Sequence, residues 1–340
     1  MANFASDNTA PAHPSVIEAL QAVNSGDMPA YGNDPVTERL RETFRTVFYS
    51  PQLTLFPVFN GSACNGLALA RMIKPYESVL AHKRSHINND ECGLPEFYTG
   101  GRIVGLDGAH GKLSPASIGG LIERTLEHAP HTSRPRAISI TQSTELGTVY
   151  SPAEVRALSA VAKTHGMFLH MDGARLANAV AFLGCPPAEV TVEAGVDILS
   201  FGGTKAGAML AEAAVIFNPV LAEDFAYIHK RAGQLPSKAR FVSAQLQALL
   251  DNDLWLTLAR HANAMAARLR EGLIARPGVG IVHPVEANEL IVTFPNGLAD
   301  QLWAKGHRFY PWPNEAPNAY RLVTHWATTE AEVEAFLGDI

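Results

Sequence analysis

Short apolar segments alternate with segments of helical periodicity along most of the chain. Apolar runs of about four to eight residues between polar or glycine residues are typical of buried strands, whereas apolar residues three and four positions apart are typical of amphipathic helices. We predict strands at 53–59, 78–82, 102–106, 136–142 and 213–217, and at the start of 167–175 and of 196–205. Helices are predicted at 35–49, 66–73, 114–128, 152–165, 175–183 and 220–231.

The alternation of strands and helices between residues 50 and 217 predicts an α/β fold, with a mainly parallel sheet covered by helices on both faces. Ligands of such sheets bind outside the carboxyl ends of the strands. The polar clusters of the chain follow predicted strands, so we expect a binding site at that edge of the sheet.

The pattern changes after residue 240. Two long helices are predicted at 241–252 and 255–274, followed by strands at 281–284, 289–294 and 320–326 and helices at 298–304 and 329–337. The first 34 residues are rich in Asn, Asp, Pro and Gly, with one amphipathic helix near 14–24, and cannot bury much themselves. We therefore predict an N-terminal arm at 1–34, a large domain at 35–250 and a small α+β domain at 251–340.

Composition narrows the class of protein. Of the 340 residues 47% are hydrophobic, enough for a large core, and the formal net charge is −6. No basic run stands out, no apolar run reaches the roughly 20 residues of a membrane span, and the amino terminus lacks the features of a secretory signal. The three cysteines, Cys64, Cys92 and Cys185, show no paired spacing, which favours a reducing cytoplasm over a disulfide scaffold or a zinc site. We expect a cytoplasmic protein with no nucleic-acid or membrane partner.

Two predicted strands are each followed by a reactive side chain at their carboxyl end. Asp172 follows the first, and Lys205 follows the second after Gly202, Gly203 and Thr204, 33 residues later. An Asp in this place is often a helix N-cap, and a lysine after glycines is often a solvated loop residue. Together, however, they suit pyridoxal 5'-phosphate, because the lysine can form a Schiff base with the aldehyde while the carboxylate keeps the pyridine nitrogen protonated. We therefore predict this cofactor.

Two other clusters are candidates for ligand binding. Gly61 and Ser62 follow a predicted strand and precede a helix, which predicts an anion site at a helix N-terminus, although a plain tight turn gives the same pattern. His86, Asp90 and Glu91 fall within six positions. No second histidine stands at the spacing of common metal motifs, so we predict no metal there. The alternative to a ligand-binding role is that His86 is a structural histidine.

Several motifs, in order, carry a family resemblance. They are ASDN at 5–8, AYGND at 30–34, FNGSACN at 59–65, SHINNDECG at 85–93, MDGAR at 171–175, FGGTK at 201–205 and YRLVTH at 320–325. Over nearly its whole length the chain resembles the low-specificity L-threonine aldolases of the fold-type I pyridoxal-phosphate group, which also holds β-eliminating lyases and aminotransferases. The resemblance implies an aspartate aminotransferase-like large domain and a homotetramer built from dimers.

The resemblance also implies roles for individual residues. Lys205 is expected to be the Schiff-base lysine, Asp172 the partner of the pyridine nitrogen, and His86 the histidine stacked on the ring. The phosphate cradle is expected from Gly61, Ser62, Ala63 and Thr204, and the clamp for the substrate carboxylate from Ser6, Arg175 and Arg321. Arg231, for the cofactor, and Tyr31, for the substrate, are expected to reach in from a neighbouring subunit.

The reaction implied by the resemblance is retro-aldol cleavage of L-threonine, L-allo-threonine and related β-hydroxy-α-amino acids, including phenylserine, to glycine and an aldehyde. The residues fit this chemistry, since two arginines can hold the substrate carboxylate while the pyridine ring accepts the electrons of the breaking Cα–Cβ bond. Twin arginines fit any α-amino acid, so β-elimination, racemisation and transamination are alternatives. A cofactor-free binding protein, in which Lys205 is incidental, is another.

One departure from the family concerns the proton acceptor. Many members carry Asn-Thr-His where this chain has Ser143-Thr144-Glu145, so the second active-site histidine of the family is absent. We expect His86 to control the β-hydroxyl proton through a bound water, because a histidine with its ordinary pKa of about 6.5 can accept a proton near neutral pH. Glu145 is the rival, but a carboxylate with an ordinary pKa of about 4.3 would need burial to compete.

Overall fold

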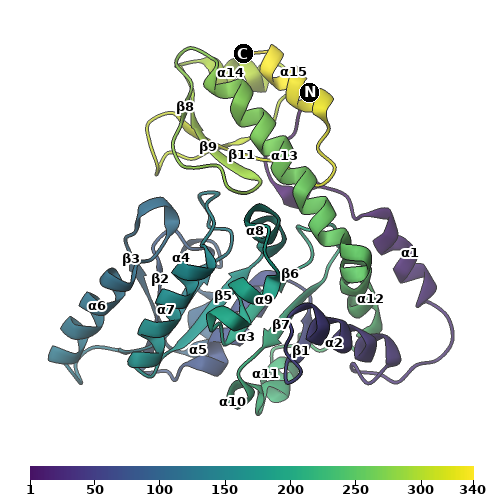
Figure 1. The fold of residues 1–340 in the computed structure, drawn as a ribbon, viewed down its shortest axis with the longest axis vertical. Helices are drawn as coiled ribbons and strands as arrows, with labels where there is room; N and C mark the ends of the chain where they lie inside the picture. Colours follow the sequence, from purple (N-terminus) through teal and green to yellow (C-terminus); the bar gives the residue numbers. More distant parts are fainter.

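The computed structural model describes residues 1–340 and contains two units, each built around one sheet (Figure 1). The larger sheet has seven strands: β1 (Thr54–Val58), β2 (Glu77–His82), β3 (Arg102–Leu106), β4 (Arg134–Thr141), β5 (Phe168–Gly173), β6 (Ile198–Gly202) and β7 (Glu212–Ile216). The smaller sheet has four: β8 (Gly280–Ile281), β9 (Glu289–Thr293), β10 (Tyr310–Pro311) and β11 (Ala319–Val323). Helix α13 (Leu254–Ile274) runs from one unit to the other (Figure 1).

Strand directions in the larger sheet bring most strand ends to one edge. The order is β1-β7-β6-β5-β4-β2-β3, in which β7 is antiparallel to both of its neighbours and the remaining pairs are parallel. Six strands therefore run in one direction, and β7 alone runs against them. The predicted α/β fold with a mainly parallel sheet is confirmed. The carboxyl ends of six strands and the amino end of β7 lie at the same edge.

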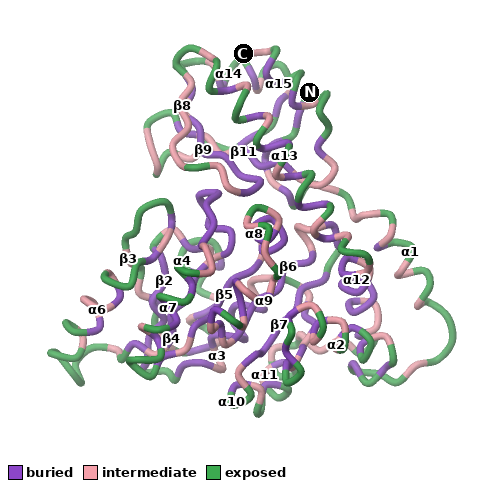
Figure 2. The backbone as a smooth tube through the Cα atoms, in the orientation of Figure 1, coloured by how far each residue is buried: buried purple, intermediate pink, exposed green.

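Helices cover both faces of this sheet and bury its alternating side chains. One face carries α2 (Pro35–Val47), α6 (Pro115–Glu127), α7 (Pro152–Thr164), α8 (Leu176–Leu183) and α12 (Arg240–Leu250), and the other carries α3 (Gly61–Met72) and α11 (Phe225–Arg231). Successive residues of β7 point to opposite faces of the sheet: Ala213 and Val215 lie in the core on one face, and Ala214 and Ile216 lie in the core on the other. Figure 2 shows most strands of this sheet as buried backbone among more exposed helices and loops, the edge strand β3 being the exception.

The smaller unit takes in both ends of the chain. Its antiparallel sheet, in the order β10-β11-β9-β8, packs with α13, α14 (Leu298–Ala304) and α15 (Glu330–Gly338). Phe4 is wholly buried in this core; its N–H donates to the carbonyl of Arg308, and its carbonyl accepts from the N–H of Val323. The first residues of the arm are therefore fixed to the smaller unit.

The arm continues through α1 (Pro14–Ala22), which packs against α12 (Figure 1). The structure thus contains an extended N-terminal segment and a separate antiparallel unit. The domain boundaries at 34 and 250 stay a prediction. None of the helices combines the length and the apolar character that crossing a bilayer requires.

Two predicted helices differ from those observed. The helix expected at 66–73 begins at Gly61, where the side chain of Asn60 caps it by accepting from the N–H of Ala63 at 2.8 Å. The apolar run indicates only the part of the helix from residue 66 onward, whereas the helix starts five residues earlier and its cap stands six residues earlier. The helix expected at 220–231 is two helices, α10 (Pro219–Ala222) and α11, because Asp224 between them has a left-handed φ of 61°.

Some short elements were not predicted at all. They are α4 (His86–Asn89), α5 (Leu94–Thr99) and β10, and the strand expected at 281–284 is reduced to the two residues of β8. Elements of this length bury too few side chains to show a period in the sequence. Among them α4 matters most, because His86 is its first residue.

Candidate active site

A cavity of about 270 Å³ opens at the edge where the strand ends of the larger sheet meet. This volume is close to the lower end of the range for small-molecule sites. Segments that follow β1, β2, β4, β5 and β6 line it, together with the start of β7 and the N-terminal arm. The predicted residues that line it are Gly61, Ser62, His86, Glu145, Asp172, Arg175, Thr204 and Lys205.

One wall of the cavity is the amino terminus of α3. The N–H groups of its first two residues, Gly61 and Ser62, have no acceptor within the helix, and the side chain of Asn60 accepts only from the N–H of Ala63. A β-carbon placed on Gly61 would meet no atom within 4 Å, so the space beside these N–H groups is open. The amino terminus of α3 therefore offers free hydrogen-bond donors and the positive end of the helix dipole, with open space beside them. Such a site can bind an anion such as a phosphate.

Lys205 and Asp172 come from adjacent strands. β5 and β6 pair in parallel with Asp172 opposite Ser200, and Lys205 stands three residues beyond the end of β6. Lys205 makes no hydrogen bond or ion pair within the chain; burial, and then the charge of Arg175, lowers the pKa of its ammonium. A lysine that loses its proton more readily is better able to attack a carbonyl carbon.

Asp172 is the first member of a chain of hydrogen bonds. Its Oδ2 accepts from Nδ2 of Asn65 at 2.8 Å, and its Oδ1 accepts from the N–H of Ala174 at 3.0 Å. The Asn65 amide also donates to Oε1 of Glu91 at 2.8 Å, and Nδ1 of His86 donates to that same oxygen at 2.8 Å. The bond to Glu91 is the main cause that raises the pKa of His86. Asp172 and His86 are therefore linked through two intervening side chains.

Glu145 is buried, with 9% of its surface exposed, yet lines the cavity. Its Oε1 accepts from the N–H of His86 at 2.6 Å and from the hydroxyl of Thr141 at 2.8 Å, whereas its Oε2 accepts no hydrogen bond. Burial, and then the charge of Asp172, raises the pKa of Glu145 to about 7. Glu145 thus has the burial that a carboxylate needs to accept a proton near neutral pH.

Arg175 lines the cavity but already binds a carboxylate of its own chain. Its Nε donates to Oδ2 of Asp7 at 2.7 Å, and its Nη2 donates to Oδ1 at 3.0 Å. Asn288 of the smaller unit also donates to Asp7, at 3.2 Å. Burial by itself raises the pKa of Asp7, but the charges of Arg175 and then Lys205 outweigh burial and lower this pKa to about 2. Asp7 therefore takes Nε and Nη2, and Nη1, which donates no hydrogen bond, lies 3.6 Å from Oε2 of Glu289.

Arg321, the other predicted clamp residue, lies outside the cavity. Its guanidinium lies over the ring of Trp312 at 4.7 Å, and its Nη2 donates to the carbonyl of Ala5 at 3.3 Å. Glu289, a buried carboxylate, lies between the two arginines, 3.7 Å from Nε of Arg321 and 3.6 Å from Nη1 of Arg175. The two arginines are close to one shared carboxylate, but only Arg175 reaches the cavity.

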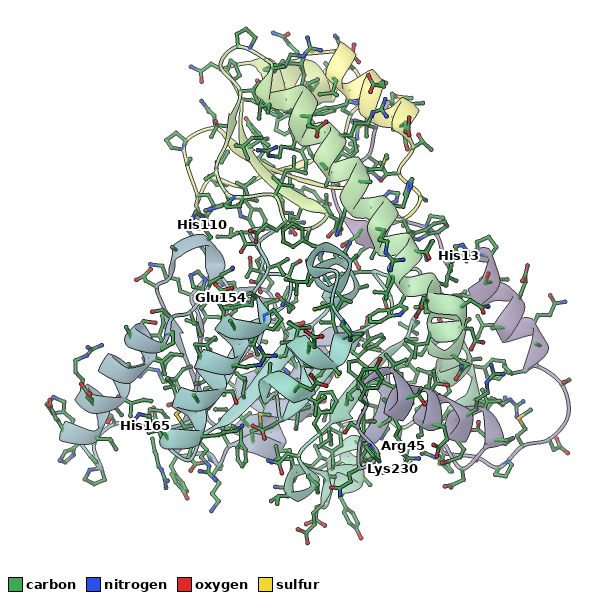
Figure 3. The ribbon with its side chains drawn as sticks, viewed as in Figure 1. His13, Arg45, His110, Glu154, His165 and Lys230 are labelled. Carbon is green, nitrogen blue, oxygen red and sulfur yellow. The ribbon has the colours of Figure 1, made fainter.

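Four more predicted residues do not line the cavity of this chain: Ser6, Ala63, Tyr31 and Arg231. Ser6 caps a short 3-10 helix, and Ala63 uses its N–H in the cap of α3. Tyr31 is half exposed, with Nζ of Lys230 4.6 Å from its ring centre, and Arg231 is exposed. Figure 3 shows Lys230 at the end of the larger unit that faces away from the smaller one. Within one chain, Tyr31 and Arg231 do not reach the site.

Six polar residues line the cavity that were not predicted to bind a cofactor or a substrate: Asn8, Asn60, Asn65, Glu91, Thr141 and Glu212. The first four stand inside the motifs that carried the resemblance. Thr141 and Glu212 stand in none of those motifs. Glu212 opens an apolar strand, and only the reversed direction of β7 brings it to the site.

A larger cavity of about 820 Å³ lies between α1, α2 and α12. Its lining contains no lysine, histidine or cysteine, and its charged side chains are Glu18, Arg39 and Asp251. Arg39 is paired with Asp251 at 3.1 Å. Glu18 is exposed and Asp251 is paired, so this cavity holds no free buried titratable group. The smaller cavity, which holds Lys205 and the buried Glu145, is the candidate active site.

Comparisons with known proteins agree on the relationship of this chain. The family model described as beta-eliminating lyase matches residues 3–296. A low specificity L-threonine aldolase of Pseudomonas aeruginosa is 43% identical, over 99% of this chain and 96% of its own length. Leishmania major threonine aldolase superposes with a TM-score of 0.93 at 28% identity, over 99% of this chain and 98% of its own. A Thermus thermophilus aspartate aminotransferase variant superposes with a TM-score of 0.75 at 18% identity, over 100% of this chain and 90% of its own.

The larger unit and the smaller unit together have the aspartate aminotransferase-like fold of fold type I, with the candidate site at the carboxyl edge of the larger sheet. This defines the class of protein. Because the family model covers most of the chain and a relative matches it over nearly the full length, the chain belongs to the beta-eliminating lyase family.

Proposed function

We propose that this protein is a low-specificity L-threonine aldolase, a lyase that cleaves L-threonine, L-allo-threonine and related β-hydroxy-α-amino acids, phenylserine among them, to glycine and an aldehyde. The proposed cofactor is pyridoxal 5'-phosphate. The observation that carries the proposal is one cavity that holds Lys205, Asp172 and the open amino terminus of α3. The names of the Pseudomonas and Leishmania relatives support the reaction.

The residues of the cavity fit the cofactor at three points. Lys205 holds its aldehyde carbon, Asp172 holds the protonated ring nitrogen, and the N–H groups of Gly61 and Ser62, with Thr204, hold the phosphate. When bound, the cofactor supplies an electron sink for the bond that breaks. The protein supplies orientation, and the bonds from Asn65 and Ala174 keep the Asp172 carboxylate in place for the ring nitrogen.

Within this reaction Glu145 accepts the β-hydroxyl proton, and His86 lies on the face of the cofactor ring. Three observations favour Glu145: its Oε2 is free, it lines the cavity, and its pKa of about 7 suits proton transfer near neutral pH. His86 is less suited, because its bond to Glu91 raises its pKa and keeps its ring protonated to higher pH. This order reverses the one expected from the sequence.

The substrate carboxylate binds Arg175 at Nη1, since Asp7 takes Nε and Nη2, and it accepts from this nitrogen in place of Glu289, which lies 3.6 Å away without a hydrogen bond. Arg321 joins the clamp by turning from Trp312 toward the cavity. Ser6 completes it, because its neighbours in the chain, Ala5 and Asp7, each contact one of the two arginines. An α-carboxylate held in this way fixes rotation of the substrate, so that the Cα–Cβ bond can be aligned with the ring.

The active form is a homotetramer built from dimers. Tyr31 and Arg231 lie away from the cavity of their own chain and are exposed, which leaves them available to a neighbour's site. Arg231 there supplies positive charge to the cofactor phosphate, and Tyr31 contacts the substrate. A cytoplasmic location is supported by three cysteines that form no disulfide.

The cofactor assignment is tested by reconstitution with pyridoxal 5'-phosphate, followed by visible absorption spectroscopy and borohydride reduction. The wild-type protein should gain a visible band, and mass spectrometry should place the reduced cofactor on Lys205. Lys205→Ala should lose both, whereas Lys238→Ala, at an exposed lysine, should keep them. A colourless wild-type protein, or an adduct on a different lysine, would refute the assignment and favour a binding protein without this cofactor.

A further inference from the structure

Glu212 is a buried carboxylate at the end of the cavity where the phosphate is proposed to bind. It opens β7, with Val58 of β1 opposite it on one side and Gly202 of β6 opposite it on the other. β1 leads into the amino terminus of α3, and β6 leads into the turn that carries Thr204 and Lys205. Glu212 therefore stands between the two halves of the proposed phosphate cradle.

The carboxylate of Glu212 holds the turn that precedes Lys205. Its Oε2 accepts from the N–H of Gly203 at 2.9 Å, and its Oε1 accepts from the N–H of Thr204 at 3.3 Å. The turn is tightly packed, because a β-carbon on Gly203 would lie 2.4 Å from the carbonyl oxygen of Ala211. Glu212 is only 6% exposed yet lines the cavity, so its carboxylate is a fixed part of the wall.

An ionised carboxylate in this place would repel a phosphate dianion. The other titratable groups that face Glu212 are Lys205, from the turn, and the buried thiol of Cys64, from α3; β1 and β6 present only the uncharged Val58 and Gly202. Lys205 is the one cation among them, and it is proposed to bond to the cofactor. Burial raises the pKa of Glu212 to about 7, so a proton can be added near neutral pH at small cost.

We propose that Glu212 is a cofactor-binding residue that takes up one proton from solvent when the phosphate binds. Protonated at Oε1, it donates its O–H to a phosphate oxygen while Oε2 continues to accept from the N–H of Gly203, the shorter of its two bonds to the turn. This inference rests on the proposed function, because it requires a phosphate-bearing cofactor in the cavity. Its consequence is that binding of the phosphate group weakens as rising pH ionises Glu212.

Isothermal calorimetry on the cofactor-stripped enzyme tests the proton uptake. Titrations at about pH 8, where a free phosphate monoester is already a dianion, are run in two buffers of different ionisation enthalpy. Pyridoxal 5'-phosphate is compared with pyridoxal, which lacks the phosphate, so that protons exchanged at the ring and at Lys205 cancel. The wild type should take up about one proton more with the phosphate ester than with pyridoxal, and Glu212→Gln about none.

The affinity ratio of the two ligands gives a second readout. Between about pH 7 and 9 the preference for the phosphate ester should fall roughly tenfold per pH unit in the wild type and stay flat in Glu212→Gln. Glu77→Gln is the matched control, because Glu77 is also a buried carboxylate but stands at the start of β2, at the opposite edge of the sheet; it should behave as the wild type.

Equal proton uptake by the wild type and Glu212→Gln would overturn the proposal. Should Glu212→Gln not fold, the wild type alone decides, since equal uptake with both ligands would also overturn it. A wild-type protein that gives no binding heat with pyridoxal 5'-phosphate would instead refute the cofactor assignment, and this inference with it. The two failures are thus distinguishable.

Discussion

The main-chain N–H of His86 donates to Oε1 of Glu145 at 2.6 Å, so one bond joins the two candidates for the proton acceptor. The bond uses one oxygen of Glu145 and leaves the other free. It uses only the backbone of His86, whose ring is left to bond with Glu91. The two side chains therefore have separate surroundings, and substitutions can separate their roles.

Glu145→Gln should keep the bond from His86 but lose the ability to accept a proton. We expect single-turnover cleavage at saturating cofactor to slow by about 100-fold or more, the size of a general-base contribution. Glu145 accepts a proton only when ionised, and its pKa is about 7, so wild-type kcat/KM should fall as pH drops below about 7. Glu145→Gln should lose this acid limb.

His86→Asn is the matched variant for the same experiment. It should weaken cofactor binding more than Glu145→Gln does, because His86 is proposed to lie on the cofactor ring, and it should keep the acid limb. If His86→Asn removes the acid limb while Glu145→Gln retains it, then His86 is the proton acceptor and the assignment to Glu145 is wrong.

Asp172→Asn should retain some cofactor and lose most catalysis. A neutral amide cannot hold the proton of the ring nitrogen, and a hydrogen bond to a charged group contributes about 1.5–3 kcal/mol, which corresponds to a rate loss of roughly 10- to 150-fold. Steady-state kinetics at saturating cofactor measures the loss. Near-normal turnover would contradict the pairing of Asp172 with the ring.

Asp7→Asn should destabilise the fold, because it breaks the buried pair with Arg175. Loss of one partner of such a pair costs about 3–5 kcal/mol of unfolding free energy. The folded pKa of Asp7, about 2, lies below its ordinary 3.8, so its contribution is present above about pH 4 and is lost as pH falls through about 2. Urea denaturation at several pH values across this range measures the free energy of unfolding of both proteins. The difference between the wild type and Asp7→Asn should become smaller as the pH falls. The exposed Asp27→Asn is the control, and an unchanged free energy of unfolding in Asp7→Asn would rule out the structural role.

Glycine binding tests the carboxylate clamp, since glycine offers only an amine and a carboxylate. Arg175→Ala and Arg321→Ala should each raise the dissociation constant for glycine about tenfold or more, the effect of losing one charged hydrogen bond. Spectral titration of the cofactor-loaded enzyme measures it, with the exposed Arg270→Ala as control. Unchanged glycine affinity in Arg321→Ala would remove that residue from the clamp.

Mixing two inactive variants tests whether Arg231 completes a neighbour's site. Lys205→Ala and Arg231→Ala should each be nearly inactive alone. After subunit exchange, a mixed dimer has one site with both residues intact, so about a quarter of wild-type activity should return. Activity that stays at the level of the separate variants would show that Arg231 acts in its own chain or not at all. Tyr31→Ala can replace Arg231→Ala in the same mixture.

Much of the site could be predicted from the sequence because strand ends carry it. Asp172 and Lys205 stand directly after apolar runs, and parallel strands bring such positions to one edge. Gly61 and Ser62 were predicted for the same reason, although the helix start was placed five residues late. These positions depend on local pattern and on a general rule of sheet topology.

The rest depends on tertiary contacts that leave no local pattern. Glu212 reaches the site only because β7 is reversed, and Asp7 meets Arg175 across 168 positions of sequence. The burial of Glu145 has the same origin, since its loop packs on the smaller unit: a β-carbon on Gly147 would lie 2.3 Å from the carbonyl oxygen of Glu289. None of these contacts has a periodicity that could be read in advance.

Product analysis with L-threonine tests the proposed reaction most directly. The cofactor-loaded enzyme is incubated with the amino acid, and glycine, acetaldehyde, ammonia and 2-oxobutanoate are quantified together. Cleavage of the Cα–Cβ bond predicts glycine and acetaldehyde in equal amounts, with neither ammonia nor keto acid above the Lys205→Ala background. Ammonia and 2-oxobutanoate in equal amounts, without glycine, would contradict it and establish β-elimination instead.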